Sequence, residues 1–159
     1  MPVWRDVVQG ARQVSPGSID NVSQAARIEN LDLRYDEGVQ TLTFYGTIHS
    51  ASHPTAYTMI LTFKDVDRLE GLTEEEIQQG YMPKPSLNNN EVMMRCSCPS
   101  YRFRFDDANR RHQAGTGARF GIYRRKTDRA PNNPNHIPGA CKRLIEFIDY
   151  LQDRGFITG

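Results

Sequence analysis

Hydrophobic and polar residues alternate along the middle of the chain in a pattern typical of β-strands. Leu42, Phe44 and Ile48 share one apolar face, which Gly46 interrupts, and residues 57–63 repeat the same period of two. Side chains two residues apart lie on one face of a strand. The pattern therefore predicts a three-stranded antiparallel meander with one face on a core and a more polar opposite face.

The C-terminal residues follow a helical period instead. Apolar side chains recur every three or four residues from Cys141 to Leu151 and form a single stripe. Pro138 suits the first turn of such a helix, and Gly155 suits its C-terminal end. An amphipathic helix that packs on the sheet is the prediction for this segment.

Other segments carry weaker patterns. Residues 1–26 show little periodicity and contain proline and glycine, which predicts an extended N-terminal arm. Thr73 and Glu76 form a capping box, which predicts a short helix. A further strand is expected to begin near Glu91 and to stop at Pro99.

These elements predict a single α+β domain over residues 1–159. It combines a small antiparallel β-sheet, a long irregular basic insertion and a C-terminal helix. The extended arm is assigned to residues 1–26, the β-meander and short helix to 27–90, and the cysteine-containing region with the final helix to 91–159. A chain of 159 residues is long enough to bury a core of its own.

The net charge of +1 conceals two oppositely charged parts. Before Arg95 there are 7 Lys and Arg residues against 13 Asp and Glu, whereas from Arg95 to Arg129 there are 10 against 3. Near-neutrality therefore does not exclude a charged binding face. No apolar run approaches the roughly 20 residues that a membrane-spanning helix needs, so we expect no membrane partner.

The three cysteines are the main candidates for chemistry. The N-terminal residues do not resemble a secretion signal, so a reducing environment is expected and a disulfide scaffold is not. Cys96, Cys98 and Cys141 can then form a metal site, with His136 as the preferred fourth ligand and His112 as the other candidate. Inert buried thiols are the alternative from the residues alone. Because no acid/base or nucleophile pattern is evident, we expect a protein that is not an enzyme.

The basic segment between the cysteines has two interpretations. Arginines alternate there with aromatic residues, which can bind phosphates and stack on bases. The same residue types are enriched at protein–protein interfaces, and protein contact is the favoured interpretation. The predicted interface residues are Arg102, Arg104, Arg124, Arg125 and Lys126.

Two stretches resemble a known pattern. Residues 96–105 read CSCPSYRFRF and residues 132–144 read NNPNHIPGACKRL. The pair is similar to a motif of tailed-bacteriophage structural proteins, in which Cys-x-Cys-Pro precedes aromatic/arginine alternation and a later Pro-Gly-x-Cys-Lys-His. It also resembles the SWIM zinc finger, whose ligands are Cys-x-Cys and a distal Cys-x-His. The similarity covers about residues 91–152.

The resemblance implies a metal and a role. Cys96, Cys98 and Cys141 fall on the zinc ligands, whereas Arg143 stands where the family has its histidine, and arginine cannot bind a metal ion. Either His136 or His112 replaces that histidine, or the site has three ligands, or only the fold persists.

The implied function is that of a non-enzymatic virion protein in the tail, baseplate or neck. Such a protein is in the host cytoplasm before assembly and then contacts other virion proteins, in many copies of a symmetric assembly. The alternative implied function is a SWIM-like zinc module that binds nucleic acid.

Overall fold

We describe the fold from a computed structural model of the chain. The described residues are 2–14, 27–36, 38–49, 56–66, 84–98, 101–102, 105–117, 133 and 137–159. The predicted short helix at Thr73 lies outside these residues. Among the described residues, no helix is both long enough and apolar enough to span a bilayer.

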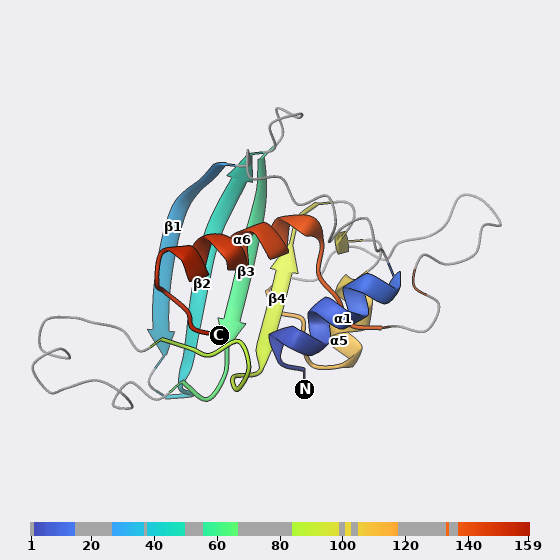
Figure 1. Cartoon of the computed structure of the whole chain (residues 1–159), viewed down its shortest axis with the longest axis horizontal. Coiled ribbons are helices and arrows are strands. Elements are labelled where there is room, and N and C mark those ends of the chain that lie inside the picture. Colours follow the sequence, from blue (N-terminus) through green and yellow to red (C-terminus); the bar gives the residue numbers. More distant parts are fainter. Residues whose placement is uncertain are drawn as a thin grey trace, which may run out of the picture.

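The described strands form a four-stranded antiparallel sheet in the order β1-β2-β3-β4 (Figure 1). The predicted meander is confirmed, and the strand expected near Glu91 joins it as the fourth member. In the register, Phe44 pairs with Leu61, and Leu61 pairs with Met94. These three residues are fully buried, as the alternating pattern requires. The strands are β1 (Arg27–Asp36), β2 (Thr41–His49), β3 (Ala56–Phe63) and β4 (Val92–Cys96).

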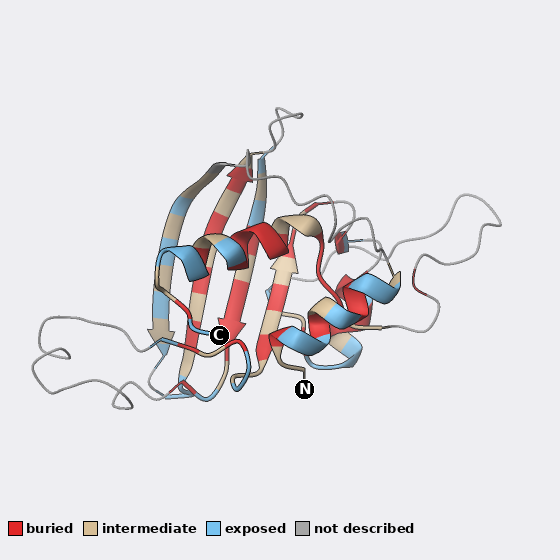
Figure 2. Cartoon of the chain, viewed as in Figure 1, coloured by how far each residue is buried: buried red, intermediate tan, exposed pale blue. Residues whose placement is uncertain are grey.

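The C-terminal helix α6 (Lys142–Asp153) is confirmed and crosses the buried face of the sheet (Figures 1 and 2). Its apolar stripe is buried against the sheet, together with Phe147. A Cβ atom at Gly46 would lie 2.9 Å from Cε2 of Phe147. The gap that Gly46 leaves in the apolar face of β2 therefore receives the Phe147 ring.

The prediction of an extended N-terminal arm is wrong for residues 4–14. These residues form helix α1 (Trp4–Val14), which buries Trp4, Val7 and Ala11. An isolated helix of this length is marginal in water, so α1 depends on its packing. Gly10 permits this packing, because it has no side chain and a Cβ there would overlap the carbonyl oxygen of Pro138. Residues 15–26 of the predicted arm lie outside the described part.

The predicted irregular insertion is partly wrong as well. Helix α5 (Asp106–Arg111) lies within it, next to β4 (Figure 1). The following backbone runs along β4, because the amide of Met94 donates to the Ala114 carbonyl at 2.7 Å and the amide of Thr116 donates to the Met94 carbonyl at 3.2 Å. The described beginning of the insertion, through residue 117, is thus part of the folded body.

Candidate metal centre

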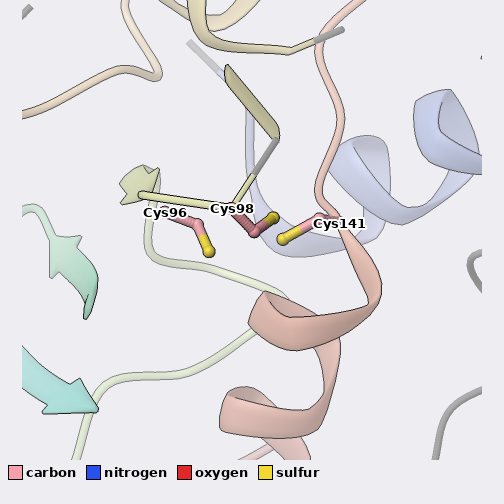
Figure 3. Close-up of side chains that lie close together, drawn as sticks. All are labelled: Cys96, Cys98 and Cys141. Atoms are coloured by element: carbon pink, nitrogen blue, oxygen red, sulfur yellow. The ribbon is translucent and has the colours of Figure 1, made fainter. Parts of the chain in front are cut away.

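Cys96, Cys98 and Cys141 meet in the interior of the protein. Cys96 is the last residue of β4, Cys98 follows two residues later, and Cys141 stands directly before α6. Their Sγ atoms all lie within 4.8 Å of one another, and each residue is fully buried. In Figure 3 the three sulfur atoms point toward a common space. We call this set the three-thiol cluster.

The end of β4 places the first two thiols on one side. Pairing with β3 continues to Ser97, whose amide donates to the Thr58 carbonyl at 3.0 Å and whose Oγ accepts from the Thr58 amide at 2.9 Å. The chain therefore stays extended through Ser97. Because residues two apart in an extended chain face the same side, Cys96 and Cys98 point into the same interior.

A helical turn follows the second thiol. The amide of Arg102 donates to the Cys98 carbonyl at 3.0 Å, and the amide of Tyr101 donates to Cys98 Sγ at 3.4 Å. A hydrogen bond from a backbone N–H favours the anionic form of the sulfur that accepts it. The turn thus brings a donor to the sulfur and carries the chain away from the cluster.

The third thiol comes from the N-cap of α6. Cys141 has extended backbone angles, φ −78° and ψ 165°, and its carbonyl accepts from the amide of Ile145 at 3.2 Å. Its side chain makes no capping bond, so the sulfur faces the cluster. The positive end of the helix macrodipole lies here and favours negative charge.

The pKa values of the three thiols are shifted in opposite directions. Hydrogen bonds from the thiols of Cys141 and Cys96 hold the pKa of Cys98 well below its usual range. Burial raises the pKa of Cys96 and that of Cys141. Negative charge is therefore favoured on Cys98 over Cys96 and Cys141.

The cluster fits a metal ion. Sulfur ligands of a tetrahedral zinc ion, at about 2.3 Å from the metal, lie roughly 3.8 Å from one another. The observed separations, all within 4.8 Å, are close to this arrangement. Because metal ligands bind as thiolates, a metal bound here would displace the thiol protons.

The described residues contribute cysteine ligands alone to this centre. His112, the second candidate for the fourth ligand, is exposed and does not join the cluster. His136 lies outside the described residues, and its role as fourth ligand stays a prediction.

Arg143, which stands where the resembling motif has a histidine ligand, packs over an aromatic ring. Its guanidinium carbon lies 4.6 Å from the centre of the Tyr57 ring, and its Nε atom is buried with no hydrogen-bond partner among the described residues. The positive charge also contributes to lowering the pKa of Cys98. Where the resembling motif has histidine, this chain places a cation beside the thiols.

Sequence reasoning missed a buried amide next to the cluster. Asn109 is fully buried on α5. Its Nδ2 donates to the Gly139 carbonyl at 2.8 Å, and its Oδ1 accepts from the Gly139 amide at 2.9 Å. The sequence offers no periodic signal for this contact, because the partner is a backbone segment 30 residues away.

The predicted interface residues fall mostly outside the described part of the chain. Arg102 is exposed, whereas Arg104, Arg124, Arg125 and Lys126 lie in undescribed segments. Two aromatic residues of the same segment, Tyr101 and Phe105, are fully buried. These two rings are core residues and cannot stack on bases.

No family model, no curated protein and no solved structure matches this chain. The function therefore has to be inferred from the chain itself.

Proposed function

We propose that this chain is a non-enzymatic structural protein that holds a zinc ion between Cys96, Cys98 and Cys141. The observation that carries the proposal is the convergence of three buried sulfur atoms from the end of β4 and the start of α6. Zinc is the metal whose structural sites in proteins are built from cysteine thiolates and histidine. His136 is the proposed fourth ligand.

The burial of the thiols supports a structural role over a catalytic one. A nucleophilic cysteine has to reach its substrate, and reactive cysteines are partly exposed. All three cysteines here have no exposed surface. A zinc ion bound there would join α6 and β4 at a point where the chain between them spans more than 40 residues.

We further propose that the protein acts in a tailed-phage particle, in the tail, baseplate or neck, through contacts with other virion proteins. The support is the resemblance of residues 96–105 and 132–144 to the motif of such proteins. The basic segment is the proposed contact surface, with Arg102, Arg104, Arg124, Arg125 and Lys126 as its charged residues. A basic face suits acidic surfaces of neighbouring subunits, including those of other copies.

The alternative function, nucleic-acid binding, has less support than protein contact. Base stacking needs exposed aromatic faces. Tyr101 and Phe105, which alternate with the arginines in the sequence, are fully buried. These two rings therefore do not support base stacking, and protein contact stays the favoured proposal.

Mass spectrometry of purified particles tests the virion role. We expect peptides of this chain in particles of the phage that encodes it, at a fixed copy number. Replacing Arg102, Arg124 and Arg125 by glutamate should reduce particle assembly, whereas Arg34→Glu on the exposed side of β1 should not. Absence of the chain from particles contradicts the role, as does DNA binding that weakens with salt and needs Arg124 and Arg125.

A further inference from the structure

The segment that follows Cys98 and the segment that precedes Cys141 meet at one buried side chain outside the three-thiol cluster, that of Asn109. Its side chain forms three hydrogen bonds there. One Nδ2 hydrogen goes to the Gly139 carbonyl and the other to the hydroxyl of Tyr101, at 2.8 and 3.1 Å. The Oδ1 atom accepts from the Gly139 amide at 2.9 Å. A buried amide that forms three hydrogen bonds fixes its partners in direction as well as in distance.

Tyr101 extends this contact to β4 and to Cys98. Its hydroxyl donates to the Met94 carbonyl at 2.8 Å, and its backbone amide donates to Cys98 Sγ at 3.4 Å. The ring is fully buried, so the hydroxyl has no water to replace these partners. Tyr101 thus binds the backbone two residues before Cys96 and also the sulfur of Cys98.

The backbone groups that Tyr101 and Asn109 bind lie close to the cysteines in the sequence. Met94 precedes Cys96 by two residues, and Gly139 precedes Cys141 by two residues. Asn109 and Tyr101 therefore join the backbone next to all three ligands. None of these hydrogen bonds involves the metal.

Close packing restricts the same segment further. A Cβ atom at Gly139 would overlap the Phe105 ring, and one at Gly10 would overlap the Pro138 carbonyl. The backbone before Cys141 is thus enclosed between α1 and Phe105. It has little room to carry Cys141 away from the cluster.

We propose that Asn109 and Tyr101 are positioning residues that hold the three thiols in metal-binding geometry before the metal arrives. The proposal rests on the proposed metal centre. A preorganised site spends less free energy on ordering its ligands, so it binds metal more tightly than a flexible one. Groups that orient ligands in this way typically contribute ~10–100-fold to metal affinity. Metal loss then leaves the site formed, and the protein can rebind the ion without refolding.

Cobalt titration of the full chain and of three variants tests the proposal. Co²⁺ reports thiolate coordination by its absorption, and its affinity is measured by competition with a chelator well below the melting temperature. We expect Asn109→Ala to weaken Co²⁺ binding by ~10–100-fold and Tyr101→Phe by about tenfold, both with an altered absorption spectrum.

Asn90→Ala is the matched control. Asn90 forms the same kind of amide contact, because its Oδ1 accepts from the Ser86 amide at 2.7 Å and its Nδ2 donates to the Lys64 carbonyl at 2.8 Å. It lies before β4, at the end of the strand opposite Cys96. Its loss should lower the melting temperature and leave Co²⁺ affinity and spectrum unchanged.

The outcomes separate the two proposals. If the unaltered chain binds no Co²⁺, the metal centre itself is wrong. If it binds Co²⁺ and the variants bind with the same affinity and spectrum, the centre stands and the positioning role is wrong. Equal weakening by Asn90→Ala also overturns the positioning role. Should Asn109→Ala fail to fold, Tyr101→Phe decides, because it removes a single hydroxyl and keeps the ring.

Discussion

The sheet core and the cysteine region are stabilised by different forces. The sheet core consists of the buried faces of β2 and β3 with α6, and its interior is almost entirely aliphatic and aromatic. The cysteine region, residues 96–117 with 137–141, buries Asp106 and Asn109 as well as three thiols. Apolar burial is non-directional, whereas hydrogen bonds and metal ligands fix geometry. The first region therefore provides stability, and the second provides a defined site.

Loss of a core aromatic ring gives the largest expected effect and sharpens this contrast. Phe44 is fully buried and packs edge-on against Phe63, with ring centres 6.0 Å apart. Phe44→Ala should lower the free energy of unfolding by ~3–5 kcal/mol. The loss should be the same with and without metal in chemical denaturation, because the ring does not belong to the cysteine region. Val39→Ala, at a side chain that is 64% exposed, is the control and should change little.

A methyl group added to the cysteine region tests whether that region defines the geometry of the metal site. Gly139→Ala would place a Cβ in overlap with the Phe105 ring. We expect a loss of ~1–3 kcal/mol from the free energy of unfolding, with a weaker affinity for metal. Gly38→Ala is a fair control, since its Cβ would meet a flexible Asp36 carboxylate at 3.3 Å. Unchanged metal affinity in Gly139→Ala would show that this segment does not shape the site.

The sheet core could be predicted from the sequence because its hydrophobic patterns are local. Phe44 and Leu61 lie in alternating strands, and Leu144 lies in a helical stripe, so each is assigned from its neighbours along the chain. Helix α5 has no such stripe, and its buried residues include Asp106 and Asn109. Asp106 pairs with Arg110 one helical turn away, whereas Asn109 bonds to Gly139, 30 residues distant, a contact that a local pattern does not contain.

The candidate site was only partly predictable for the same reason. The spacing of the cysteines and the resemblance together pointed to the three thiols, which do meet in space. The contribution of α1 was missed, because the contact of Gly10 with Pro138 brings together segments more than 120 residues apart. Arginine cannot bind a metal ion, and the position of Arg143 over Tyr57 is a tertiary contact that no local pattern contains.

A smaller effect is expected where the two regions meet, at Arg143. Three thiolates with one divalent ion carry a net negative charge, which a nearby cation stabilises. Arg143→Met should cost about 0.5–2 kcal/mol through the lost contact with Tyr57, and more in the metal-loaded protein than in the metal-free one. Thermal unfolding of both forms measures the difference.

Arg154→Met provides the matched control for that experiment. Arg154 stacks on Tyr150 at 4.7 Å, at the opposite end of α6 from the cluster. Its loss should cost the same with and without metal. An identical metal dependence in both variants would argue against a role for Arg143 at the metal centre.

The central claim is that the three-thiol cluster holds a structural metal ion. Elemental analysis of the purified chain, combined with melting curves before and after chelation, tests it most directly. We predict one zinc ion per chain, a melting temperature that falls sharply on chelation, and loss of both the ion and this response in Cys98→Ser. At free metal 100-fold above its dissociation constant, the stabilisation is about 2.7 kcal/mol. No bound metal, together with identical melting curves for the untreated, chelated and Cys98→Ser proteins, would contradict the claim.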